Sequence, residues 1–237
     1  MKFLGTFALF SFQSYQILAQ QEQGSSDIED ISGRKLNQIW NMLYHIEPSF
    51  NSEPDSRQFI LKHGCYCHAS GASPVGSRNG YHGAPLDELD ALCRDLWRSQ
   101  KCLNHEESDA DDEKCPTTVA YAFEKNGDKD NNDASIACGR ASSDRWMNKD
   151  EHQCDIKLCE LEKEFAYKVK ELIASGFQRD PSISKIADAE YEQFCPNNGF
   201  AEQRENFACC GEGIGRKPFD PVTKQCCADR ITEVGSC

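Results

Sequence analysis

The side chains of this chain that could carry out chemistry are two histidines and a dense group of carboxylates. His63 and His68 flank the run Gly64-Cys65-Tyr66-Cys67, and an imidazole is the usual general base near neutral pH. Between residues 104 and 133, ten Asp or Glu stand against three Lys, which concentrates negative potential that attracts Ca²⁺. The residue types therefore point to base catalysis or calcium binding, although a lone loop histidine is typically a surface residue.

Within the acidic segment, Asp128, Asp130 and Asn132 have the spacing of the first three ligands of an EF-hand loop. However, Asp133 stands where that loop needs its turn glycine, and Gly139 stands where the closing glutamate belongs. We therefore expect no closed calcium cage and no tightly bound cofactor. A solvated, charged loop that binds calcium weakly, or adsorbs to calcium mineral, is the expectation.

Fourteen cysteines in 237 residues, without paired C-x-x-C zinc knuckles, are typical of an extracellular protein held by disulfides. Lys2, an apolar run and Ala19 predict a secretory signal peptide over residues 1–19. No other apolar run is long enough to span a bilayer. The mature protein is expected to be secreted, soluble and extracellular.

The net charge of −13 disfavours a phosphate-binding surface, so we expect no nucleic-acid partner and little adsorption to anionic lipid. Extracellular proteins, zwitterionic lipid surfaces and mineral surfaces remain as partners.

Apolar residues at helical spacing predict three helices, over 35–46, 85–101 and 151–174. Between the second and third helices, Tyr121-Ala122-Phe123 and Asn126-Gly127 predict a short β-hairpin. We name residues 64–67 the cysteine-rich loop. The helices and the hairpin must position any active group on this loop.

The run Gly64-Cys65-Tyr66-Cys67, followed by Asp87, Asp90 and Cys93 in the second helix, resembles the core of secreted phospholipase A2. The motifs of that family are G-C-Y-C-G-x-G-G and D-x-x-D-x-C-C-x-x-H-D. The resemblance implies a mainly α, disulfide-rich fold with a small β-wing, covering residues 34–196. In that family a histidine activates water, while calcium, held by loop carbonyls and an aspartate, stabilises the oxyanion.

Leu96 and Trp97 stand at the positions of the family's catalytic His-Asp pair. Leucine cannot accept a proton, and tryptophan offers no anionic oxygen to a metal. The matching calcium ligands are the backbone carbonyls of Tyr66, His68 and Ser70, but two of the three loop glycines are replaced. The resemblance therefore implies a degenerate calcium loop and no catalytic residue, unless His63 or His68 supplies a displaced base.

The resemblance also implies disulfides between Cys67 and Cys93 and between Cys65 and Cys195. Two bridges of the family are absent here. One lacks its cysteine at Leu92, and the other lacks both cysteines, at His45 and Lys125. Five other cysteines lie before the tail, and five lie within it. Because both numbers are odd, we infer that one bridge joins the two parts. The cysteines expected to be bonded are Cys65, Cys67, Cys93, Cys102, Cys115, Cys138, Cys154, Cys159, Cys195, Cys209, Cys210, Cys226, Cys227 and Cys237.

The third helix can be aligned with the family in two ways. In one alignment Glu162 takes the place of the buried Asp that supports the catalytic His, and in the other Glu160 takes it. Neither alignment restores a base.

The tail contains Cys209-Cys210-Gly211, then Pro218-Phe219-Asp220, then Gln225-Cys226-Cys227. This order resembles one dicysteine repeat of the galaxins, matrix proteins of coral skeletons. A small disulfide knot of another kind would have similar spacing. We expect a signal peptide over 1–19, a flexible N-terminus over 20–33, a phospholipase A2-like domain over 34–196 and a dicysteine module over 197–237.

The expected function is that of a secreted, non-catalytic, phospholipase A2-like protein that binds an extracellular partner or belongs to a matrix, including a mineralised one. The alternatives are an active calcium-dependent phospholipase A2 with a displaced dyad, and a toxin or receptor ligand. An open cleft at Leu96 would favour lipid binding, and a filled one would favour a scaffold.

Overall fold

The structure is a computed structural model that describes residues 38–50, 63–67, 83–106, 121–131, 133–139, 151–183, 193–196 and 207–237. The predicted signal peptide and N-terminal segment lie outside the described residues, as do His68, Ser70 and Cys115.

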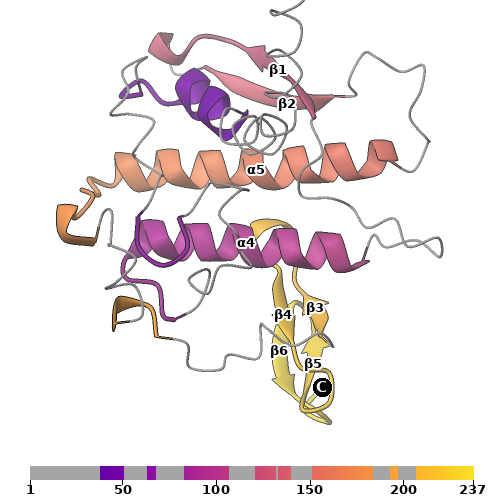
Figure 1. The fold of residues 1–237 in the computed structure, drawn as a ribbon. Coiled ribbons are helices and arrows are strands. Elements are labelled where there is room, and N and C mark those ends of the chain that lie inside the picture. The colour runs from indigo at the N-terminus through magenta and orange to yellow at the C-terminus, as the bar shows by residue number, and fades with distance from the viewer. Residues whose placement is uncertain are drawn as a thin grey trace, which may run out of the picture.

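Two long helices, α4 (Glu88–Glu106) and α5 (Glu151–Ala174), run side by side through the centre of the molecule (Figure 1). The bounds of α5 are those the sequence predicts. The predicted bounds of α4, 85–101, are wrong at both ends. Asp87 caps the helix, since its Oδ1 accepts the backbone N–H of Asp90 at 2.9 Å, and the helix then continues to Glu106.

A helix over 38–46 and a hairpin lie on the other side of α5 from α4 (Figure 1). The hairpin strands are β1 (Ala122–Asn126) and β2 (Ser135–Gly139), paired antiparallel with Asn126 opposite Ser135, and the 3-10 turn η2 (Lys129–Asn131) lies in the loop between them. Gly127 opens this loop at φ +71°, where an added Cβ would lie 2.3 Å from the Asp133 carbonyl oxygen.

One apolar cluster joins these elements, because each helix turns its apolar face toward the others. Its members with no exposed surface include Met42, Leu43, Ile46, Leu89, Leu158, Ala166 and Val169. Phe165 is 2% exposed and Leu96 of α4 is 8% exposed in the same cluster.

The tail forms two small hairpins. In the first, β3 (Ala208–Cys210) pairs with β4 (Lys217–Phe219) around the 3-10 turn η5 (Gly213–Gly215). In the second, β5 (Lys224–Cys227) pairs with β6 (Arg230–Glu233). The described residues thus combine helices with three two-stranded sheets. The fold is disulfide-rich, and strands contribute too much for it to be called mainly α on these residues.

The two halves of the tail are placed differently. Ile214 in η5 is 2% exposed and belongs to the main core, and its backbone N–H donates to Oε2 of Glu164 in α5 at 2.9 Å. By contrast, β5 and β6 extend away from α4 as a projection (Figure 1). The first half of the tail is therefore packed into the body, whereas the second half is not.

Six disulfides lie between described residues. They are Cys65–Cys195, Cys67–Cys93, Cys102–Cys209, Cys138–Cys159, Cys210–Cys226 and Cys227–Cys237. The first two are the pairs that the phospholipase A2 resemblance implies, and the third is the expected bridge between body and tail. Cys154 is also disulfide-bonded, and no described cysteine is free. Among the described helices, none has the length and apolar character needed to cross a membrane.

Candidate functional site

The face of α4 that contains Leu96 is filled by packed side chains. Leu96 is 8% exposed and lies in the main core, and the partly buried Trp97 packs against that core. The Trp97 ring lies 6.2 Å from the Tyr66 ring of the cysteine-rich loop, and the Lys101 ammonium lies 5.4 Å from the Trp97 ring centroid. Neither Leu96 nor Trp97 can accept a proton or offer an anionic oxygen, so these two positions supply no base and no anionic metal ligand.

A buried carboxylate nevertheless lies close to this face of α4. Glu162 of α5 has no exposed surface, and its Oε1 accepts the side-chain amide of Gln100 at 3.1 Å. Its Oε2 accepts the hydroxyl of Tyr121. Burial, and then the adjacent Glu162, raise the pKa of Tyr121, so the phenol stays protonated and donating.

Gln100 follows Leu96 by one helical turn, so the two side chains share one face of α4. Glu160 points elsewhere, since its carboxylate is 49% exposed and pairs with Lys163. Of the two alignments that the sequence leaves open, the structure places Glu162 inside and Glu160 outside. We name Gln100, Tyr121 and Glu162 the Glu162 cluster.

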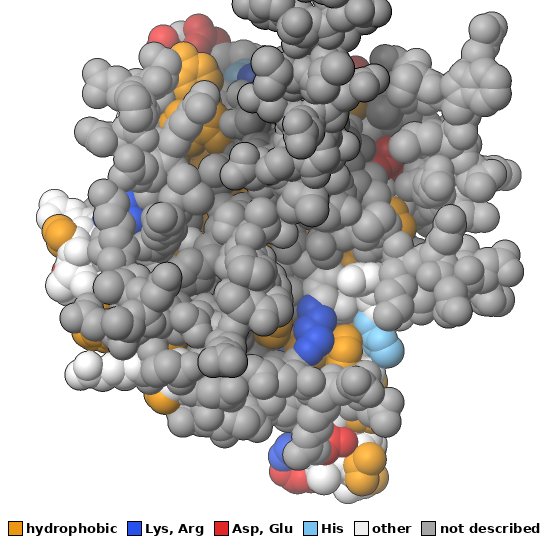
Figure 2. All heavy atoms as spheres, viewed as in Figure 1, with side chains coloured by type: hydrophobic (Ala, Val, Ile, Leu, Met, Phe, Trp, Pro, Cys, Tyr) orange, Lys and Arg blue, Asp and Glu red, His pale blue; other side chains and the backbone are white. Residues whose placement is uncertain are grey.

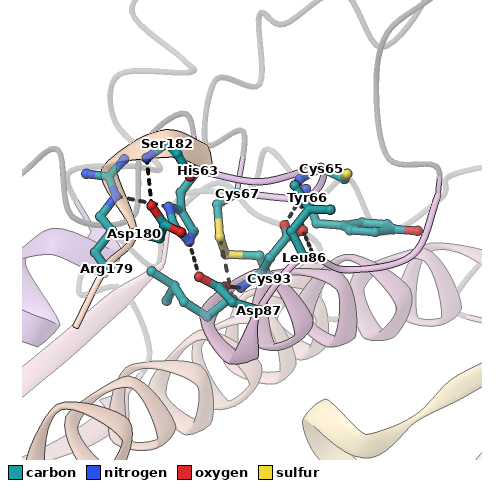
Figure 3. A network of polar contacts seen from close by, with 12 residues as sticks. His63, Cys65, Tyr66, Cys67, Leu86, Asp87, Cys93, Arg179, Asp180 and Ser182 are labelled. Carbon is teal, nitrogen blue, oxygen red and sulfur yellow. Dashed lines mark hydrogen bonds and ion pairs between the residues drawn. A yellow bond between two sulfur atoms is a disulfide. The ribbon is translucent and has the colours of Figure 1, made fainter. Parts of the chain in front are cut away.

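A second buried polar cluster is built on His63, which the sequence analysis expects at the surface. That expectation is wrong, because His63 has no exposed surface. Its Nε2 lies 2.6 Å from Oδ2 of Asp87, and its Nδ1 accepts Nε–H of Arg179 at 3.0 Å (Figure 3). Since Arg179 can only donate, Nε2 carries the imidazole proton and donates it to Asp87.

This arrangement, the His63 cluster, holds its histidine away from Leu96. Asp87 precedes Leu96 by nine residues, about 13 Å along a helix axis at 1.5 Å per residue. Both ring nitrogens are engaged, so neither is available to a water molecule. His63 therefore does not supply the displaced base, and His68 lies outside the described residues.

The cysteine-rich loop is organised around a carboxylate. Asp90 has no exposed surface, and it accepts the backbone N–H groups of Cys65, Tyr66 and Leu86 at 2.9, 2.7 and 2.9 Å. Burial raises the pKa of Asp90, and these hydrogen bonds oppose the rise. Gly64 makes the approach feasible at φ +62°, because an added Cβ would lie 2.2 Å from the Asp90 Cγ.

Of the calcium ligands that the family resemblance implies, Tyr66 is described, whereas His68 and Ser70 lie outside the described residues. The backbone N–H groups of Cys65 and Tyr66 donate to the Asp90 carboxylate, and the side chain at the carboxylate-ligand position is the indole of Trp97, which offers no anionic oxygen. Within the described ranges, no group of histidine, cysteine and acidic side chains could hold a metal ion. We derive no chemical step through calcium for this chain.

A hydrogen bond lies where many family members have a disulfide between the first helix and the wing. The imidazole Nε2 of His45 is 3.0 Å from the carbonyl oxygen of Asn126, the neighbour of Lys125. The Gln38 side-chain amide also donates to the Tyr121 carbonyl at 2.8 Å. Polar contacts therefore fasten the first helix to the hairpin without sulfur.

Comparisons with protein families, curated proteins and solved structures found no significant match to this chain. Its function has to be inferred from the geometry of the two clusters and from the residues around them.

Sequence reasoning missed four residues of these clusters. Nothing in the sequence pairs His63 with Arg179, which is 116 residues away, and the pattern around Tyr121 indicates only a strand. Asp87 matches a motif position, but the motif does not predict its partner. Gln100 carries a usable signal, because it stands one helical turn after Leu96 on the face that would hold a catalytic group.

Proposed function

We propose that this chain is a secreted, non-catalytic, phospholipase A2-like protein that acts as an extracellular scaffold or matrix component. The observation that carries the proposal is the burial of Leu96: at 8% exposure it is a core side chain at the position where the family has its base. Because this position is filled, it supports a scaffold role in preference to a lipid-binding role. The paired disulfides Cys65–Cys195 and Cys67–Cys93 support the family framework.

The docking of the tail supports the matrix version of this proposal. Cys102–Cys209 links α4 to β3, and the Ser99 hydroxyl donates to the Arg216 carbonyl at 3.3 Å. The galaxin-like order of cysteines therefore belongs to a segment that is built onto the body at one end and projects at the other. Such a projection is suited to contact with a partner or a surface.

The net charge of −13 directs the proposal toward calcium-rich surfaces. We expect adsorption of the whole protein to calcium mineral that falls steeply between 0.1 M and 1 M salt, because the Debye length drops from about 10 Å to about 3 Å. Depletion of the protein from solution by suspended mineral measures this. Adsorption indifferent to salt, or one submicromolar stoichiometric calcium site by calorimetry, would reject the charge-density mechanism.

A further inference from the structure

We propose that the disulfide Cys227–Cys237 is a thiol-exchange site through which the projecting β5–β6 hairpin is joined covalently to a cysteine thiol of an extracellular protein. The incoming thiolate attacks Sγ of Cys237, the Cys227–Cys237 bond breaks, and Cys227 leaves as a thiolate. One disulfide is consumed and one is formed, so no external oxidant or reductant is required.

Access to sulfur distinguishes this bridge from the others. In each of the other described bridges at least one cysteine is buried, with Cys65, Cys102, Cys159 and Cys195 fully so. Cys237 is exposed and Cys227 is only half-buried. Exchange requires a direct approach of the thiolate to one sulfur, so the outer bridge reacts first.

The surroundings of Cys227 suit a leaving group. The Thr232 hydroxyl lies 2.9 Å from its Sγ and must be the donor, because a disulfide sulfur has no proton. The Gln225 side-chain amide lies 3.5 Å from the same sulfur. Hydrogen bonds to a thiolate lower its pKa, and a thiolate of lower pKa leaves faster.

Gln225 also contacts the attacked sulfur, with its Nε2 2.9 Å from Sγ of Cys237. The amide therefore touches both sulfurs, whereas the Thr232 hydroxyl is placed at Cys227 alone. This difference, together with the greater exposure of Cys237, sets the direction of exchange.

The neighbouring bridge Cys210–Cys226 provides an internal comparison. Cys226 is exposed, so a thiolate could reach it, but the leaving sulfur would be that of Cys210, which is 4% exposed. A thiolate released into an apolar interior is disfavoured by desolvation. Exchange at this bridge is therefore slower, although both bridges lie in the same module.

Opening the outer bridge leaves the packing of the body unchanged. Residues 234–237 are all exposed, and Val234 is 58% exposed. The bridge spans 10 residues, the shortest separation among the described disulfides, so it constrains the unfolded chain least. At the end of the projection, acidic, basic and hydrophobic side chains lie together at the surface (Figure 2).

The experiment uses the whole oxidised protein and reduced glutathione as the peptide thiol, followed by rapid alkylation with iodoacetamide and peptide mapping. We expect one glutathione per chain on Cys237, an alkyl group on Cys227, and every other bridge intact. First addition at Cys226 or Cys227, or simultaneous opening of several bridges, overturns the proposal.

Two variants test the role of the hydroxyl. Thr232→Val is expected to slow glutathione addition several-fold, because it removes the donor to the leaving sulfur. Thr223→Val is the matched control, since Thr223 contacts Val234 through its backbone carbonyl, and it is expected to react at the original rate. Equal rates in the two variants overturn the role of the Thr232 hydroxyl in stabilising the leaving sulfur of Cys227.

Discussion

The Glu162 cluster and the His63 cluster are both buried and both built from catalytic residue types, yet they differ in what surrounds them. Glu162 lies beside the α4 face of Leu96 and accepts hydrogen bonds from Gln100 and Tyr121, which are both neutral. His63 has a carboxylate on one nitrogen and a guanidinium on the other, and it lies near the start of α4. Glu162 therefore lies close to the position where the phospholipase A2 resemblance implies a catalytic histidine, whereas His63 lies away from that position.

The comparison shows that a buried side chain of a catalytic type does not form a catalytic site unless one of its reactive atoms is accessible to water or substrate. In the His63 cluster every imidazole nitrogen is engaged, so the histidine links the loop, Asp87 and the segment after α5. In the Glu162 cluster the carboxylate orders Gln100 and Tyr121 around a leucine. Both clusters are therefore expected to act on stability.

The largest effect is expected for Glu162→Ala. The change leaves the buried Tyr121 hydroxyl and the half-buried Gln100 amide without this acceptor, at about 1–3 kcal/mol each, and opens a cavity, so the free energy of unfolding should fall by about 3–5 kcal/mol. Denaturant unfolding followed by circular dichroism measures this. Glu160→Ala on the exposed face is the control, expected within about 0.5 kcal/mol of the parent. Equal effects of the two changes would show that the buried Glu162 stabilises the fold no more than the exposed Glu160 does.

The next largest effect is expected for His63→Ala, which removes the partner of both Asp87 and Arg179. Hydrogen bonds to charged groups contribute about 1.5–3 kcal/mol each. Asp87 and Arg179 are only partly buried, so water can replace part of both contacts, and a loss of about 2–3 kcal/mol in the free energy of unfolding is expected. The control is His45→Ala, whose single contact to the Asn126 carbonyl predicts a loss of about 1 kcal/mol. A His63 variant as stable as the His45 variant would contradict the geometry of the His63 cluster.

Leu96→His sharpens the comparison by adding a base where the Glu162 cluster lies. Burial at position 96 lowers the pKa of the new histidine, whereas the nearby Glu162 carboxylate favours the imidazolium and raises it, so the pKa should depend on residue 162. An NMR titration of the imidazole reports it. In the double variant Leu96→His with Glu162→Gln, the pKa should fall back; an unchanged pKa would mean that Glu162 does not face position 96.

The smallest effect concerns Asp180, which lies beside Arg179. Hydrogen bonds from the Ser182 side chain and backbone lower the pKa of Asp180, so this group adds stability above its unfolded pKa and loses it as pH falls through the folded value. Ser182→Ala should therefore slightly flatten the decline of unfolding free energy below about pH 4. A steeper decline in the Ser182→Ala variant than in the parent would mean that Ser182 does not lower the pKa of Asp180.

Much of the framework follows from local patterns. The apolar periodicity of α5 locates it correctly, because Ser175-Gly176 ends the helix and Gly176 adopts φ +88°. The start of α4 is misplaced, because Pro85 and Asp87 are both favourable near a helix N-terminus and only the capping contact distinguishes them. Odd cysteine counts predict a bridge between body and tail, but not its identity as Cys102–Cys209.

The candidate site was less predictable, because it depends on contacts between distant segments. A motif locates Leu96 and Trp97, but the burial of His63 depends on Arg179, and the choice between Glu160 and Glu162 depends on the rotation of α5 against α4. A helix register error of two residues turns a side chain by about 200°, from the core to solvent. Sequence spacing alone does not resolve that rotation.

The most direct test of the central claim is hydrolysis of phospholipid micelles by the whole protein with millimolar calcium, measured with and without a chelator. With Leu96 and Trp97 in the places of base and carboxylate, the expected rate equals that of buffer under both conditions. Turnover above buffer that disappears with the chelator would contradict the claim.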